Sequence, residues 1–272
     1  MDQQVTYQTP LRLFWWKGVP NFGDALSRIV VEHVSGRTVE HSGVGGAQIC
    51  AVGSILQIVR RKFAEGGKHR PWIWGSGLLH HVPRDFLKHV DIALLRGPVT
   101  ASLLGLKPKA FGDPGLLIAN ALGDRPERGD VIGLVPHHTQ LDDPQIRALV
   151  DADPRLQLID VRDDAETVCR AIGACAHVCA SSLHGLVTAD AYGVPSTWMD
   201  PGEQSHFKYH DYAASIGRAM ITPLAWKDIP SQFKTLTNTQ PLPHADGIAL
   251  AQEALRDSFP APLRATTVSG VN

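Results

Sequence analysis

The sequence predicts an α/β protein built from two Rossmann-like domains. Short apolar runs alternate with amphipathic stretches along most of the chain, a pattern typical of parallel strands joined by helices. With 272 residues, 43% of them hydrophobic, the chain is long enough for two cores of ordinary domain size. A segment of mixed Gly, Pro and charged residues at 122–130 interrupts the alternation and is the best candidate for a linker. We therefore expect one domain over residues 1–127 and a second over residues 128–272.

The first half contains four apolar runs that we interpret as strands. They cover residues 11–16, 48–52, 72–74 and 92–95. Helices are expected over residues 25–34, 55–64 and 99–104. Gly36 is placed to end the first of these helices, and Pro98 suits the first turn of the third.

The second half repeats this rhythm as far as residue 199. Strands are expected over residues 131–135, 156–161, 177–180 and 195–199, and helices over residues 144–151, 165–174 and 184–192. Two further helices are expected over residues 207–216 and 248–259, joined by a Pro- and Thr-rich stretch at 230–243. The residues from 260 onward are expected to be loose.

Charge and composition argue against several functions. The formal net charge is −1 and the longest basic cluster is Arg60, Arg61 and Lys62, so no footprint for nucleic acid is visible. The first ten residues lack a signal-peptide pattern, and no apolar run approaches the ~20 residues that span a bilayer. We expect a cytoplasmic protein, with peripheral contact at the inner face of the plasma membrane left open.

The four cysteines lack the paired short spacing of a structural zinc site. They are Cys50, Cys169, Cys175 and Cys179. Most stand in apolar surroundings, where cysteine commonly fills core space, and we expect them to stay reduced. No metal site is expected.

Five turns at expected strand ends are candidates for ligand binding, because open α/β sheets bind ligands beyond the carboxyl ends of their strands. They are Asn21-Phe22-Gly23-Asp24, Gly53-Ser54, Gly75-Ser76-Gly77, Arg96-Gly97-Pro98 and Ser181-Ser182-Leu183-His184-Gly185. None matches a dinucleotide-binding GxGxxG or a GxxxxGK[ST] phosphate loop. Any single glycine among them is explained as well by tight turning between a strand and a helix.

Taken in order, these turns carry a family resemblance. Together with Gly112-Asp113-Pro114, Val135-Pro136-His137 and Lys208-Tyr209-His210-Asp211-Tyr212, they resemble the polysaccharide pyruvyl transferase family, most closely the exopolysaccharide ketal-pyruvate transferases. The resemblance covers residues 11–217. It implies a GT-B-like arrangement of two domains with the site in the interdomain cleft. It also implies phosphoenolpyruvate as the donor substrate, without a further cofactor.

The resemblance assigns roles to particular positions. Arg96 matches the arginine of the family's first domain, on the expected acceptor side, and Leu183-His184 matches the Leu-His pair of the donor-binding turn in the second. Some branches carry an arginine where Ser182 stands, so the cation that binds the donor phosphate remains open. Arg96, Lys208 and Arg162 are the candidates, although Arg162 could simply pair with a neighbouring aspartate on the surface.

The chemistry of ketal formation requires an acid and a base. His184, with an ordinary imidazole pKa near ~6.5, is the expected acid or the partner of the departing phosphate. Asp24 could accept the sugar proton or cap the helix that follows it. Asp113 is expected to shape a turn.

We expect a transferase that moves the pyruvyl group of phosphoenolpyruvate onto a saccharide, free or lipid-linked, as a cyclic ketal. The expected catalytic residues are His184, Asp24 and Arg96. The expected substrate-binding residues are Asn21, Gly23, Ser54, Gly75, Ser76, Gly77, His137, His138, Ser181, Ser182 and Lys208. The alternatives are a GT-B glycosyltransferase, which would release a nucleotide, and a noncatalytic module that binds a sugar or anion without turnover.

Overall fold

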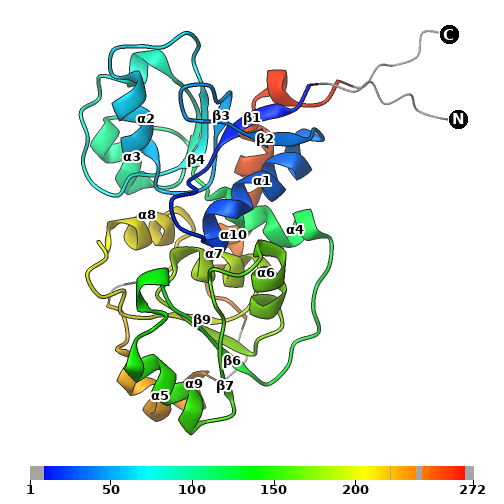
Figure 1. Cartoon of the computed structure of the whole chain (residues 1–272), viewed down its shortest axis with the longest axis vertical. Helices are drawn as coiled ribbons and strands as arrows, with labels where there is room; N and C mark the ends of the chain where they lie inside the picture. Colours follow the sequence, from blue (N-terminus) through cyan, green and yellow to red (C-terminus); the bar gives the residue numbers. More distant parts are fainter. Residues whose placement is uncertain (1–8, 221, 237–240, 267–272) are drawn as a thin grey trace, which may run out of the picture.

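Two parallel sheets form the framework of the molecule (Figure 1). The computed structural model describes residues 9–220, 222–236 and 241–266. The first sheet has the order β2-β1-β3-β4-β5, with β1 (Leu11–Phe14), β2 (Val39–His41), β3 (Ile49–Cys50), β4 (Trp72–Ser76) and β5 (Asp91–Leu95). The second has the order β7-β6-β8-β9, with β6 (Ile132–Val135), β7 (Leu156–Leu158), β8 (His177–Ala180) and β9 (Ser196–Trp198). All paired strands are parallel, which confirms the predicted α/β class with Rossmann-like sheets.

Helices follow most of the strands. In the first half they are α1 (Phe22–Ser35), α2 (Leu56–Phe63), α3 (Pro98–Leu104) and α4 (Ile118–Leu122), with 3₁₀ turns η1 (Leu87–His89) and η2 (Pro114–Leu117). In the second half they are α5 (Pro144–Ala152), α6 (Ala165–Gly173), α7 (Leu183–Tyr192), α8 (Phe207–Ser215), α9 (Ile229–Leu236) and α10 (Ala245–Ser258), with η3 (His138–Gln140), η4 (Trp226–Asp228) and η5 (Ala261–Leu263).

Several segments differ from the sequence-based expectation, among them the short helix α4, which was not expected. Strand β2 was missed because it has three residues, two of them exposed, and so lacks an apolar run. Helix α9 lies within the stretch interpreted as a connector, and its Pro230 is tolerated because it stands in the first helical turn. The segment from residue 260 to 266 is anchored rather than loose, since the Ala265 amide donates to the Ser35 carbonyl at 2.7 Å. Residues 237–240 and 267–272 lie outside the described residues.

One apolar core runs through both halves of the chain. Leu26 and Val30 of α1 belong to the same cluster of buried side chains as Leu186 and Val187 of α7. In Figure 1, α1 lies between the upper sheet and the helices of the lower half. The expected boundary at 127/128 stays a prediction, and residues 123–130 form no helix or strand.

Helix α10 packs on the first sheet, although its sequence position grouped it with the second half. The Trp74 indole of β4 donates to the Leu255 carbonyl at 3.0 Å, and its ring meets Phe259 edge to face. Gln252 donates to the Leu116 carbonyl at 2.8 Å. An amphipathic pattern shows that one face of a helix is buried, but it does not show which sheet covers that face.

The burial of the cysteines and the character of the helices agree with what the sequence predicted. All four cysteines are buried and unpaired, as expected of core residues. Within the described ranges, no helix has the length and apolar character needed to cross a membrane.

Candidate functional site

A cavity of about 400 Å³ lies beside the point in each sheet where successive strands begin to be added on the opposite side. In the first sheet this change occurs between β1 and β3, and in the second between β6 and β8. The loops that leave the carboxyl ends of these four strands all reach the cavity, as expected for ligand sites at topological switch points. The lining residues are Trp16, Asn21, Asp24, Gly53, Ser54, Ile55, Gln57, Ile58, Arg61, Leu79, His137, His138, Thr139, Ser182, Leu183, His184, Gln204 and Lys208.

The amino ends of three helices, α1, α2 and α7, border this cavity. Asn21 caps α1 by accepting from the Gly23 amide at 3.2 Å, and Ser182 caps α7 by accepting from the Gly185 amide at 3.3 Å. Helix α2 begins after Ile55 without a side-chain cap. Helix amino ends carry partial positive charge, so the cavity favours anionic ligands.

Asp24 does not cap the helix that contains it. The helix begins at Phe22, three residues before the expected start, and Asn21 occupies the capping position. The Asn21 amide donates to Asp24 Oδ2 at 3.0 Å, and the carboxylate borders the cavity. Burial raises the pKa of Asp24 to about 6, against the lowering effects of the Asn21 hydrogen bond and the Lys208 charge. Asp24 is therefore available for proton transfer near neutral pH.

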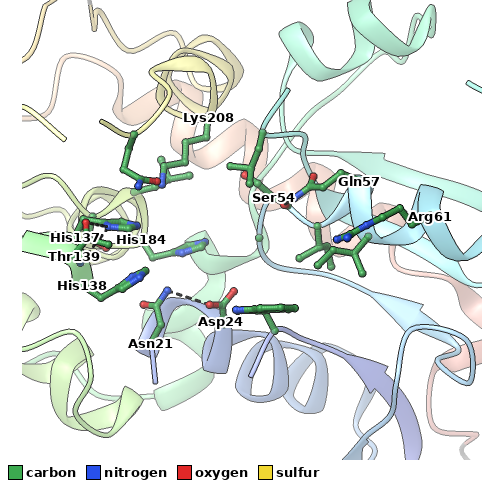
Figure 2. A pocket seen from close by; sticks show the side chains of 18 residues that line it. Asn21, Asp24, Ser54, Gln57, Arg61, His137, His138, Thr139, His184 and Lys208 are labelled. Carbon is green, nitrogen blue, oxygen red and sulfur yellow. Dashed lines mark hydrogen bonds between the residues drawn. The ribbon is translucent and has the colours of Figure 1, made fainter. Parts of the chain in front are cut away.

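His184 lies at the centre of the site, almost fully buried at 8% exposure (Figure 2). Its Nε2 atom faces Asp113 Oδ2 at 3.8 Å, and neither atom has a hydrogen-bond partner in the described part of the chain. The other oxygen of Asp113 accepts from the Gly115 amide at 2.9 Å and caps η2. Asp113 thus shapes a turn, as expected, and also forms a buried pair with the histidine.

The protonation states of this pair are set by burial. Burial and the positive charges of Arg96 and Lys208 lower the pKa of His184 to about 3, so the imidazole is neutral at pH 7. Burial raises the pKa of Asp113 to about 6, against the attraction of Arg96. The ordinary imidazole pKa assumed from the sequence does not apply, because the position of His184 in the chain did not reveal its burial.

Gly23 makes room for the imidazole. A Cβ atom at this position would lie 2.3 Å from His184 Nδ1, well inside any allowed contact. The backbone of α1 therefore packs directly on the histidine ring. Gly23 does not line the cavity, and the geometry assigns it a steric role instead of the expected contact with substrate.

Arg96 is fully buried and does not line the cavity. Its Nε donates to Asp211 Oδ2 at 3.0 Å, its Nη1 to Ser54 Oγ at 2.5 Å and its Nη2 to the Leu78 carbonyl at 3.1 Å. Asp211 also accepts from the amide and hydroxyl of Thr100, both at 2.8 Å. This buried ion pair joins the end of β5 to α8 and orients Ser54. The arrangement fits a positioning residue better than the anion-binding role expected from the sequence.

Lys208 of α8 supplies a cation on one side of the cavity. Burial and the charge of Arg96 lower its pKa to about 8, while Asp24 acts in the opposite direction. Arg61 of α2 lies on the other side (Figure 2), is exposed and has no partner among the described residues. Arg162 pairs with Asp160 at 2.6 Å and is not part of the site.

The remaining wall is formed by the loop after β6. His137 Nδ1 lies 2.9 Å from Thr139 Oγ1, and the His137 amide donates to Ser181 Oγ at 2.9 Å. Burial, Lys208 and His138 lower the pKa of His137 to about 3. Ser181 does not reach the cavity; it holds this loop, and its carbonyl accepts from the Tyr209 hydroxyl at 2.5 Å.

The structure brings together most, but not all, of the side chains expected from the sequence. Asn21, Asp24, Ser54, His137, His138, Ser182, His184 and Lys208 line the cavity, whereas Gly23, Gly75, Ser76, Gly77, Arg96 and Ser181 do not. The turn at 75–77 is buried, with Ser76 donating to the Ala51 carbonyl and Gly77 lying against the Arg96 guanidinium. The polar and aromatic lining residues missed from the sequence are Trp16, Gln57, Arg61, Thr139 and Gln204.

Gln57 and Arg61 were recognisable in principle. They stand four residues apart on the helix that follows Gly53-Ser54, so they share one face, with Gln57 in its first turn and Arg61 in its last. Trp16 and Gln204 lie in irregular loops, where no periodic pattern indicates the direction of a side chain.

Parallel Rossmann-like sheets, with a cavity at the switch points of both, define an α/β protein whose ligand site lies at the carboxyl ends of its strands. Residues 21–203 match the family model described as polysaccharide pyruvyl transferase, and the chain belongs to this family. It is 34% identical over 178 residues to the succinoglycan biosynthesis protein ExoV of Rhizobium meliloti, covering 62% of this chain and 54% of that protein.

Two further similarities are weaker. An uncharacterized protein of Acanthamoeba polyphaga mimivirus is 27% identical over 162 residues, covering 53% of this chain and 54% of that protein. The chain thus spans about half the length of the curated relatives that it matches. A crystal structure of a functionally uncharacterized protein from Klebsiella pneumoniae covers 78% of this chain and 93% of its own, with a TM-score of 0.46 and 13% identity.

Proposed function

We propose that the protein transfers the pyruvyl group of phosphoenolpyruvate onto two hydroxyls of a saccharide, giving a cyclic ketal and inorganic phosphate. Membership of the polysaccharide pyruvyl transferase family supports pyruvyl transfer to a polysaccharide or its precursor. The observation that carries the proposal is the cavity, in which cationic groups and helix amino ends lie around His184, with the fully buried Asp113 behind the imidazole. We further propose that the two halves form a GT-B-like pair of domains and that this cavity is their cleft.

The donor carries two anionic groups that need separate partners. We propose that its phosphate lies between Lys208 and the amino end of α7, because both provide positive potential beside His184. The carboxylate then extends toward Arg61 and the uncapped amino end of α2. Lys208 and Arg61 therefore divide the task expected of the arginine that some family members carry in place of Ser182.

The reaction requires one proton at C3 of the donor. Protonation of C3 makes C2 electrophilic, and a first sugar hydroxyl adds to C2 as it loses its proton. The C2–O bond to phosphate then breaks, the bridging oxygen leaves with phosphorus, and the second hydroxyl closes the ketal. The two sugar hydroxyls release two protons. One of them restores the proton that the enzyme gave to C3, and the other leaves on hydrogen phosphate.

His184 is the proposed proton donor to C3. Its lowered pKa makes it neutral at pH 7 in this structure, but the dianionic phosphate of a bound donor would offset the repulsion from Arg96 and Lys208 and raise the pKa of the imidazole. The carboxylate of Asp113, facing Nε2, would stabilise the imidazolium. Asp24, ionised above pH 6, is the proposed acceptor of the first sugar proton.

The proposal is tested by incubating the protein with phosphoenolpyruvate and a panel of saccharides while inorganic phosphate is measured. Phosphate release that requires a saccharide supports pyruvyl transfer. Release of a nucleotide from a nucleotide sugar, without consumption of phosphoenolpyruvate, would instead identify a glycosyltransferase. If the protein binds phosphoenolpyruvate but releases no phosphate with any saccharide, it is a noncatalytic module.

A further inference from the structure

Trp16 exposes a large aromatic surface inside the candidate site. Three large apolar side chains are exposed among the described residues, namely Trp16 at 46%, Val19 at 39% and Leu250 at 67%. Of these three, Trp16 alone lines the cavity. A single exposed apolar residue on an open surface needs no explanation, but an exposed indole in the wall of a cavity that also holds charged side chains offers a surface to a ligand.

The indole is supported by the loop that contains it. A Cβ atom at Gly18 would lie 2.3 Å from Trp16 Cζ2 and 2.6 Å from Cε2, so the Gly18 backbone packs against the ring. This contact restricts the ring without covering it. A restrained aromatic surface binds a ligand at a lower entropic cost than a freely rotating one.

The position of Trp16 relates it to the acceptor. The tryptophan follows β1, and the same loop leads to Asn21 and Asp24 at the start of α1. The cationic side chains Lys208 and Arg61 come from α8 and α2. A ligand resting on the indole would therefore meet the carboxylate of Asp24, whereas an anionic donor would be drawn to the two cations.

We infer that Trp16 is the stacking platform of the acceptor subsite and binds a pyranose ring through one of its C–H faces. This inference rests on the proposed function and specifies how the saccharide is held. A pyranose has polar hydroxyls around its rim and C–H bonds on its faces, which matches an indole that is apolar on its face and bordered by polar groups. Stacking would leave the rim hydroxyls free to reach Asp24.

The first test separates acceptor binding from donor binding. Trp16→Ala should raise the KM for the saccharide about tenfold or more while leaving the KM for phosphoenolpyruvate within about twofold. Trp16→Phe, which keeps a smaller aromatic face, should recover part of this loss. Leu250→Ala, which removes an exposed apolar side chain outside the cavity, is the control and should behave as the unmodified protein.

The second test does not depend on turnover. Saturation-transfer NMR with methyl β-glucopyranoside and methyl β-galactopyranoside should show transfer to ring C–H protons, and Trp16→Ala should abolish it. Trp72→Phe is the matched control and should retain the signal. Trp72 stands at the amino end of β4, whereas the cavity lies beyond the carboxyl ends of the strands.

Unchanged saccharide KM and unchanged saturation transfer in Trp16→Ala would overturn the inference. Equal increases in both KM values would also overturn it, because they would indicate a general disturbance of the cavity. If the unmodified protein binds the methyl glycosides through Trp16 but never consumes phosphoenolpyruvate, the acceptor platform stands and the proposed reaction fails.

Discussion

Asp113 Oδ2 and His184 Nε2 face each other at 3.8 Å, each without another hydrogen-bond partner in the described structure. The separation exceeds a hydrogen bond by about 0.6 Å or more, so a small movement of the imidazole on ligand binding would close it. Two buried polar groups without other partners cost stability, and such a cost is commonly retained where it serves function.

The first prediction concerns the stability cost of Asp113. Its pKa of about 6 in the folded protein exceeds the value of 3.8 for an unperturbed aspartate. Its contribution therefore favours folding below pH 4 and is lost as the pH rises through 6, a change of about 3 kcal/mol. Asp113→Asn keeps an acceptor for the Gly115 amide but has no carboxyl group to ionise. The free energy of unfolding of this variant minus that of the unmodified protein should therefore be larger at pH 7 than at pH 4. Urea denaturation at both pH values measures this, and a constant difference would contradict it.

The second prediction concerns the charge on His184. If phosphate binding protonates this histidine, calorimetry at pH 7 in buffers of different ionisation enthalpy should detect proton uptake with phosphoenolpyruvate. His184→Gln should take up about one proton fewer on binding the donor. It should also lose turnover by ~10²-fold or more. Equal proton uptake by both proteins would show that the imidazole remains neutral and that another group supplies the proton.

A variant that leaves His184 unaltered provides an independent check on the same prediction. Gly23→Ala adds a methyl group that must displace the imidazole, although alanine favours a helix by ~1 kcal/mol over glycine. Turnover should therefore fall without loss of folding. Gly43→Ala is the control, because a Cβ there meets nothing within 4 Å.

The sequence indicated the alternation of strands and helices and the turns after β1, β3, β6 and β8, because these depend on local pattern. It identified His184 by its place at a helix start. It did not reveal that Asp113 and His184 meet, because they are 71 residues apart and their approach depends on packing between η2 and α7. The burial of Arg96 likewise depends on Asp211, from a helix whose position no local pattern fixes.

The third prediction follows from the burial of Arg96. Arg96→Met leaves the carboxylate of Asp211 buried without its charged partner and should destabilise the protein by ~3 to 5 kcal/mol. Arg96→Met combined with Asp211→Asn should recover part of this loss, because the amide oxygen can still accept from Thr100. Thermal unfolding of the single and double variants measures the effect. If Arg96→Met is fully stable and only the affinity for phosphoenolpyruvate falls, Arg96 is a donor-binding residue after all.

The fourth prediction uses the lowered pKa of Lys208. With a pKa of about 8, the amine loses its positive charge as the pH rises from 7 to 9. In a His184→Gln background, where donor binding takes up no proton at the imidazole, the affinity for phosphoenolpyruvate should still fall over this range. Adding Lys208→Met to this background should weaken binding ~10- to 100-fold at pH 7, with little further change up to pH 9. Titration calorimetry measures both. Lys62→Met, on the exposed surface outside the cavity lining, should keep the pH dependence of the unmodified protein.

The most direct test of the proposed reaction is to run it in D₂O with phosphoenolpyruvate and a saccharide that supports phosphate release, and to analyse the product by NMR and mass spectrometry. Protonation of C3 by the enzyme predicts a ketal whose methyl group carries a single deuterium, formed in equal amount to inorganic phosphate. A His184→Gln protein should form this product at least ~10²-fold more slowly. A saccharide product that retains the enolpyruvyl CH₂ group, or that carries phosphate without pyruvate, would contradict ketal formation at this site.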